Sequence, residues 1–126
     1  MEVKKPKEII ELERALGIDS VDDFVWDGEH VTELVIRFKN LTDISLIGVF
    51  EHLRKLDLIG NEIADLSPLK ILKELTFLYL GENEIVDLSP LRELRSLTEL
   101  YLAENKIIDL LPLKSLQGLT YLGLGS

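Results

Sequence analysis

A leucine pattern with a constant spacing of twenty-two residues runs through most of this chain and constrains its fold more than any other feature. The pattern L-x-x-L-x-L-x-x-N-x-I begins at Leu53 and returns at Leu75 and at Leu97. A further copy starts at Leu119 and stops at Ser126, one residue before the next asparagine would fall. A strict internal period of this length is typical of a solenoid, in which each unit contacts only its neighbours.

Within one unit the spacing of the apolar residues changes. Leu56 and Leu58 flank a polar residue, and this alternation predicts a half-buried strand. Beyond the asparagine the spacing becomes three, at Leu66, Leu69 and Leu72, which favours a short 3₁₀ turn. Because one unit cannot bury its leucines alone, stacked units should form a parallel sheet on the concave face and 3₁₀ turns on the convex face. The predicted fold class is α/β.

Each turn contains a candidate cap. The serines of Ser67-Pro68 and Ser89-Pro90 are predicted to cap the turn, with proline at its first position. The third unit has Leu111 in place of the serine, so its turn should be less well capped. An aspartate also recurs every twenty-two residues, and local backbone N–H groups are a better explanation for it than a cation. These aspartates are Asp43, Asp65, Asp87 and Asp109.

The residues before the repeats predict a cap built from a helix and a hairpin. Pro6 and Gly17 bound an amphipathic segment, and Asp27-Gly28-Glu29 is a tight-turn signal between two apolar runs. Trp26, on this hairpin, is interpreted as part of the cap's core. The predicted organisation is one domain, with the cap in 1–30 and the repeats in 31–126. The repeats divide into a degenerate copy (31–52), three full copies (53–74, 75–96, 97–118) and a partial one (119–126).

The unit from Leu75 to Leu91 resembles leucine-rich repeats of the twenty-two-residue class, known from bacterial internalins and from phosphatase-binding repeat proteins of eukaryotes. The resemblance extends over residues 31–126. It implies a right-handed solenoid and protein recognition on the concave sheet. It also implies an asparagine ladder that bonds backbone groups of successive turns, formed here by Asn61, Asn83 and Asn105.

The outward strand positions supply the candidate binding residues. Aromatic residues gather on neighbouring strands and, at half exposure, would offer on the order of 300–500 Å² of apolar surface. The predicted anchors are Phe77, Tyr79, Tyr101 and Tyr121, with Lys55, Asp57 and Glu99 setting specificity. The alternative is that the rings pack across the strands and only stabilise the sheet.

Composition narrows the classes of function. With 14 basic and 23 acidic residues the formal net charge is -9, which disfavours nucleic acid and anionic membranes and suits a basic protein partner. The chain has no cysteine and two histidines, and it shows no phosphate-binding loop, catalytic triad or metal-ligand cluster. A non-catalytic module without cofactor or metal is therefore expected. The polar N-terminal residues make a cytoplasmic location the expectation.

A second class of function follows from the last copy of the repeat. Ending within a repeat would leave a strand edge and its leucines uncovered. Two explanations remain: the chain is the recognition arm of a longer protein, or two copies form a homodimer through this C-terminal edge.

Overall fold

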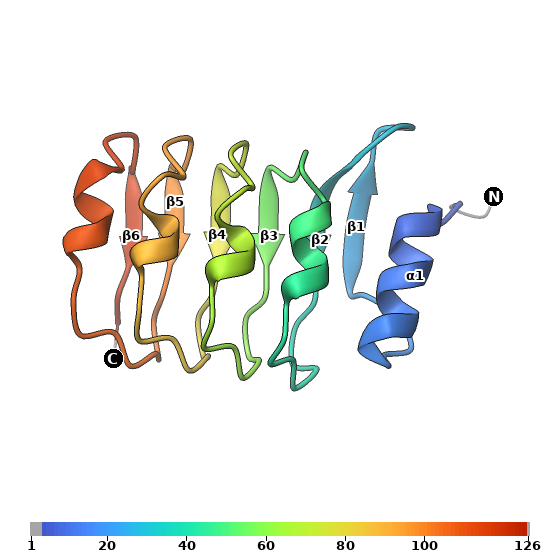
Figure 1. Cartoon of the computed structure of the whole chain (residues 1–126), viewed down its shortest axis with the longest axis horizontal. Coiled ribbons are helices and arrows are strands. Elements are labelled where there is room, and N and C mark those ends of the chain that lie inside the picture. Colours follow the sequence, from blue (N-terminus) through green and yellow to red (C-terminus); the bar gives the residue numbers. More distant parts are fainter. Residues whose placement is uncertain (1–3, 126) are drawn as a thin grey trace.

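The structure, a computed structural model, describes residues 4–125 and contains one six-stranded sheet whose strands follow chain order (Figure 1). Each strand after the first belongs to one copy of the repeat. The strands are β1 (Asp23–Trp26), β2 (Val31–Val35), β3 (Lys55–Asp57), β4 (Phe77–Tyr79), β5 (Glu99–Tyr101) and β6 (Tyr121–Gly123).

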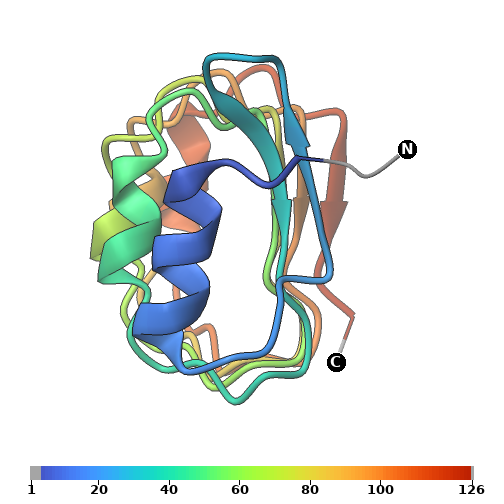
Figure 2. The same ribbon diagram turned by 90° about the vertical axis from the view of Figure 1, so that its right-hand side faces the viewer.

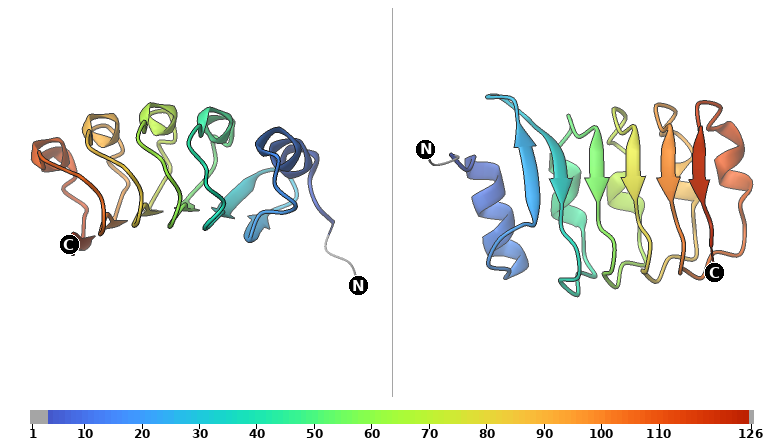
Figure 3. Two further views of the ribbon diagram at one scale, coloured as in Figure 1. Left: turned by 90° about the horizontal axis from the view of Figure 1, so that it is seen from below. Right: turned by 180° about the vertical axis from the view of Figure 1, so that it is seen from behind.

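Residues that are twenty-two positions apart in the sequence stand opposite each other on neighbouring parallel strands. From β2 to β6 all pairs are parallel, and Leu56, Leu78, Leu100 and Leu122 stand directly opposite one another on successive strands (Figure 3, right). The first pair differs, because β1 and β2 form an antiparallel hairpin. Since β2 belongs both to this hairpin and to the first repeat, cap and repeats share one sheet. The predicted boundary at residue 30 stays a prediction.

A second layer of 3₁₀ helices covers the inner face of the sheet, and the strand side of the stack is concave (Figures 2 and 3). At its N-terminal end this layer continues into α1 (Lys7–Leu16), which lies beside η1. The predicted fold class, with a parallel sheet on the concave face and 3₁₀ turns on the convex face, is confirmed. The 3₁₀ helices are η1 (Ser45–Val49), η2 (Ser67–Leu69), η3 (Ser89–Leu91) and η4 (Leu111–Ser115).

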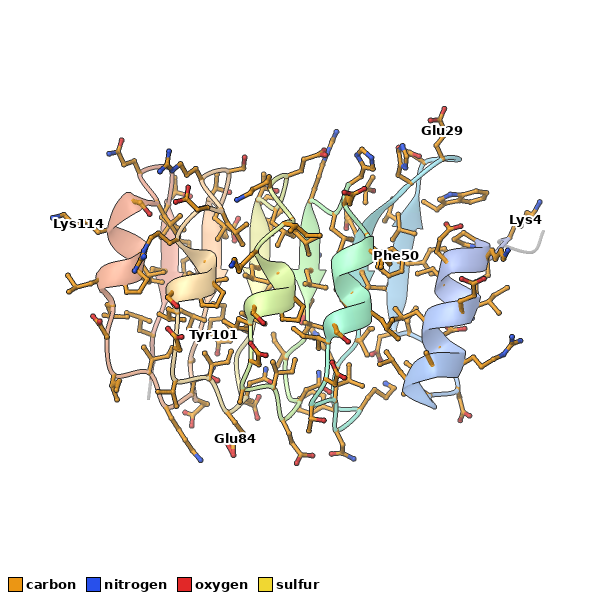
Figure 4. The ribbon with its side chains drawn as sticks, in the orientation of Figure 1. Lys4, Glu29, Phe50, Glu84, Tyr101 and Lys114 are labelled. Carbon is orange, nitrogen blue, oxygen red and sulfur yellow. The ribbon has the colours of Figure 1, made fainter. Side chains whose placement is uncertain are left out.

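The repeated leucines form the core between these two layers, and side chains fill the space between them (Figure 4). Three of these leucines illustrate the burial, and each is 0 % exposed: Leu78 and Leu100 from the strands, and Leu72 from the segment whose leucines are three residues apart. Complete burial of one such side chain stabilises the fold by about 1.5–3 kcal/mol. Leucines with a spacing of two thus belong to the sheet side of the core, and leucines with a spacing of three belong to the side of the 3₁₀ helices.

The asparagines connect each turn to the preceding one. The Asn83 side chain donates to the carbonyls of Leu58 and Leu80, both at 3.0 Å, and accepts the Ile63 N–H at 3.0 Å. Asn61 and Asn105 form the same bonds one unit earlier and one unit later. This arrangement satisfies backbone groups that burial would otherwise leave without partners.

The aspartates cap the 3₁₀ turns, and the prediction that serine does so is wrong. Ser67 is the first residue of η2, and its backbone N–H donates to the Asp65 carboxylate at 2.9 Å. Leu111 donates to Asp109 at the same distance, so the third turn keeps this bond despite lacking the serine. The prediction that the recurring aspartates accept local backbone N–H bonds is confirmed, and the capping group lies two residues before the position predicted from the Ser-Pro pairs.

At the N-terminal end, α1 and the hairpin cover the first repeat. Helix α1 ends at Gly17, whose positive φ of 70° allows the chain to reverse. Ile9 and Leu12 are buried, and Phe50 lies between η1 and α1 (Figure 4). Trp26 is partly buried against the same core. None of the helices within residues 4–125 is long and apolar enough to cross a membrane.

Candidate functional site

The concave face is organised in rows that cross the strands. Strands β3 to β6 present their first and third residues on this face and β2 presents its third and fifth, and the register places equivalent residues side by side. The first row is Glu33, Lys55, Phe77, Glu99 and Tyr121, and the second row is Val35, Asp57, Tyr79, Tyr101 and Gly123. The seven predicted binding residues all lie in these two rows.

The four aromatic residues come together over β4, β5 and β6. Tyr79 and Tyr101 are directly opposite each other. Tyr121 is 50 % exposed, whereas Phe77, Tyr79 and Tyr101 are only partly exposed, so the apolar surface is smaller than the half-exposed estimate from the sequence. None of the four rings forms a close stacked pair with another within residues 4–125. Tyr101 is held instead by neighbouring backbone, and Tyr79 by Glu99.

Two glycines hold the ring of Tyr101 against the sheet. A Cβ atom on Gly81 would lie 2.5 Å from Cε2 of this ring, and a Cβ on Gly123 would lie 2.5 Å from Cδ1. Neither glycine has a positive φ, so the need at both positions is for space. The Tyr101 ring therefore packs between two backbone segments that carry no side chain, which restricts its motion in the absence of a ligand.

Tyr79 is held by a side-chain hydrogen bond. Its hydroxyl donates to Oε1 of Glu99 at 3.1 Å. Burial, and then the bond to Glu99, raises the pKa of the Tyr79 hydroxyl above its ordinary value of 10.0. The hydroxyl therefore stays protonated at neutral pH and remains a donor to the carboxylate.

Asp57 lies on the predicted face but is 1 % exposed, so its predicted direct contact with a partner needs correction. Its carboxylate accepts hydrogen bonds from Nε of Arg37, at 2.9 Å, and from Nη2 of the same guanidinium. It also accepts the Ile59 N–H at 3.2 Å. Asp57 is covered by Arg37, and its role is to position that cation. This contact also raises the pKa of Arg37.

Sequence reasoning missed Arg37, whose side chain is 48 % exposed. The available signal was its place in the repeat, because the equivalent positions in later units are Ile59, Gly81 and Ala103. A cation at a position otherwise occupied by small or apolar residues indicates a fixed charge on the face. With Lys55, which is partly exposed in the first row, Arg37 places two cations on the N-terminal half of the face, beside the carboxylates of Glu33 and Asp57.

The two histidines lie elsewhere, between the hairpin turn and the segment after η1. The rings of His30 and His52 stack with centroids 3.7 Å apart, and Nδ1 of His52 lies 3.1 Å from the Glu74 carboxylate. Across residues 4–125, no group of three or more His, Cys, Asp or Glu side chains is arranged to hold a metal ion.

Comparison with known proteins places this geometry in a family. The model of "Leucine Rich repeats (2 copies)" matches residues 51–93 and 73–115, together just over half of the chain. No curated protein sequence matches significantly.

Several solved structures are similar over most of the chain. An internalin (inlF) from Listeria monocytogenes is 39% identical over 95% of this chain and 36% of its own length, with a TM-score of 0.78. An internalin C2 from the same species is 36% identical over 71% of this chain and 41% of its own length, with a TM-score of 0.68. A leucine-rich-repeat protein of Leptospira interrogans is 30% identical over 75% of this chain and 25% of its own length, with a TM-score of 0.70.

The chain spans less than half the length of each of these three bacterial structures. The ectodomain of a receptor kinase from Arabidopsis thaliana, at 24% identity and a TM-score of 0.67, shares the fold. Family model, register and asparagine ladder agree, and the chain belongs to the leucine-rich-repeat family.

Proposed function

We propose that this chain is a non-catalytic module that binds a protein partner on its concave face. The observation that carries the proposal is the seating of Tyr101 between Gly81 and Gly123. Tyrosine is a frequent anchor in protein interfaces, and an anchor that is already fixed loses less conformational freedom on binding. Tyr79, held by Glu99, and the half-exposed Tyr121 extend this anchor across three strands.

The exposed surface of the rings supports binding in addition to sheet packing. Tyr101 packs across strands, over Gly81 and Gly123, and Tyr79 bonds to Glu99. All four rings nevertheless keep exposed surface on the concave face, which sheet packing alone does not use. Leucine-rich repeats generally mediate protein–protein interaction, which supports the same assignment.

The test is capture of partners by the immobilised chain, with wild type compared to the Tyr79→Ala/Tyr101→Ala double variant. Loss of two interface anchors should weaken capture of a specific protein by about thirtyfold or more. Ile71→Ala is the matched control, because Ile71 is 56 % exposed and follows η2 on the opposite side of the molecule. Equal capture by wild type and by a folded double variant contradicts the proposal.

A second candidate is self-association through the surface around β6 and η4. Leu111 is 72 % exposed, and Leu122 and Leu124 are 39 % and 41 % exposed. Two copies that buried these leucines against each other would form a homodimer. Light scattering of the chain at high concentration, with Leu122→Lys as the comparison, tests this candidate. A monomer at every concentration excludes it.

The cytoplasmic location and the role as recognition arm of a larger protein remain proposals.

A further inference from the structure

Glu99 is the acidic centre of the aromatic group on the concave face. Phe77 on β4 and Tyr121 on β6 stand directly opposite it on either side. The Tyr79 hydroxyl donates to its Oε1 at 3.1 Å, and Tyr101 follows two residues later on the same strand and face. A single carboxylate is therefore bordered by four aromatic residues.

Glu99 has no cation, unlike the two buried carboxylates of residues 4–125. Asp57 is covered by Arg37, and Glu13 lies 2.9 Å from the amino group of Lys5. Glu33, partly exposed in the same row, also has no cation in the described part of the chain, but its neighbour in register on β3 is Lys55, whereas the neighbours of Glu99 are Phe77 and Tyr121. Within residues 4–125, no lysine, arginine or histidine lies within ion-pair distance of Glu99, and its Oε2 accepts no hydrogen bond. One oxygen of a partly shielded carboxylate thus remains available.

This combination selects a positively charged occupant. A cation is attracted both by the carboxylate and by the electron-rich faces of tyrosine and phenylalanine rings. A purely apolar occupant would strip water from the carboxylate without replacing its hydrogen bonds, which is unfavourable. An anionic occupant would meet direct repulsion from Glu99.

The charges on the rest of the face restrict where such a cation can bind. Lys55 lies in the same row on β3, two strands from Glu99, or about 10 Å at ordinary strand spacing. Lys55 repels a second cation from the vicinity of Glu33, its neighbour in register, and the charge of Arg37 is already paired with Asp57. Glu82 and Glu104, both exposed just beyond β4 and β5, add negative charge at the aromatic end.

We infer that the group formed by Glu99, Phe77, Tyr79, Tyr101 and Tyr121 receives the cationic side chain of an arginine or lysine residue of the protein partner. This inference rests on the proposed function and names the chemistry that the partner must present. The competing explanation is that Glu99 serves only to orient Tyr79.

The Glu99→Gln variant separates these explanations. Glutamine keeps an oxygen that can accept the Tyr79 hydroxyl bond and removes only the negative charge. Glu33→Gln is the matched control, because Glu33 lies in the same row of the same face and is also partly exposed. Its neighbour in register is Lys55 in place of an aromatic residue.

The probes are three capped tripeptides, glycine–X–glycine, with X as arginine, lysine or the neutral arginine analogue citrulline. Each is titrated into the full chain, and backbone and aromatic NMR shifts are recorded. The arginine or lysine peptide should shift signals of residues 77–121, the citrulline peptide should bind more weakly, and added salt should weaken the cationic peptides. Glu99→Gln should reduce their affinity about tenfold, with no change in Glu33→Gln.

Failure of this inference is distinguishable from failure of the proposed function. Equal binding of arginine and citrulline peptides, no binding of either cationic peptide, or equal effects of the two glutamine variants overturns the cation site. If capture of a partner is nevertheless lost in the Tyr79→Ala/Tyr101→Ala variant, binding on the concave face stands without it. Loss of peptide binding in Glu99→Gln alone, with the fold intact by circular dichroism, supports the cation site.

Discussion

The ring of Tyr101 occupies the space that any side chain at position 81 would need, because a Cβ there would lie 2.5 Å from Cε2 of the ring. The glycine and the tyrosine are therefore coupled, although they belong to different repeats. The proposed partner-binding anchor therefore depends on a glycine of the preceding repeat.

Gly81→Ala should destabilise the chain by about 1–3 kcal/mol, because the methyl group forces the tyrosine ring out of its seat. The cost should largely disappear in a Tyr101→Ala background, since the obstructing ring is gone. Urea unfolding of the two single variants and the double variant measures the coupling. Gly118→Ala is the control, because a Cβ there meets its nearest atom at 3.5 Å. Additive effects of the two changes would contradict the seating described here.

Asn83→Ala should cost about 3 kcal/mol or more, because it leaves the Ile63 N–H and the Leu58 carbonyl without their buried partner. Asn105→Ala should cost less, since Asn105 is partly exposed and water can replace some of its bonds. Thermal and urea unfolding of both variants checks the order. Equal losses would show that exposure does not govern the strength of the ladder.

Arg37→Met should lower the free energy of unfolding by about 1 kcal/mol, because the carboxylate of Asp57 loses its cation. The value is modest since half of the Arg37 side chain is exposed to solvent. A double-mutant cycle with Asp57→Asn isolates the pair. A coupling energy near zero would mean that Arg37 only covers Asp57 without stabilising it.

Acid should unfold the chain through the capping aspartates. The backbone N–H of Ser67, and then its hydroxyl, lowers the pKa of Asp65 below its ordinary value of 3.8, and Ser89 does the same for Asp87. A lowered folded-state pKa means that the stabilisation is present above the unfolded-state pKa and is lost as the pH falls through the folded-state pKa. Stability should therefore decline below about pH 4.

Urea unfolding between pH 7 and pH 2 measures this decline. The Asp65→Ala/Asp87→Ala variant should be less stable at pH 7 and should lose less on acidification. Asp19→Ala, which removes an exposed carboxylate that accepts no hydrogen bond within the described residues, should leave the profile parallel to wild type. A double variant as acid-sensitive as wild type would contradict the assignment.

The sequence predicts the fold and the composition of the concave face because both follow from a period. Once leucines at a spacing of twenty-two fix which residues point inward, Tyr79 and Tyr101 must lie side by side. The conformation of a side chain and the identity of its hydrogen-bond partner do not follow from the period. The partner of Asp57 is twenty residues earlier, two residues beyond the end of β2, and the long Arg37 side chain reaches it by a conformation that no spacing encodes.

The turn caps show the same limit at short range. The sequence Asp-Leu-Ser-Pro offers two residues whose oxygen can accept a backbone N–H, and both fit the composition of a cap. The backbone of Leu66 and Ser67 decides between them, because it directs the Ser67 N–H to the aspartate. The sequence therefore predicts that the aspartates bind local backbone N–H groups, but it does not predict that they cap the turns in place of the serines.

The bonds of the asparagine ladder cross between turns in one direction only. Asn61, Asn83 and Asn105 each reach to the turn before their own. During synthesis, a newly emerging unit therefore finds every partner for its asparagine already made and in place. We therefore expect the asparagine ladder to form in the order of synthesis, as each unit docks on the one before it.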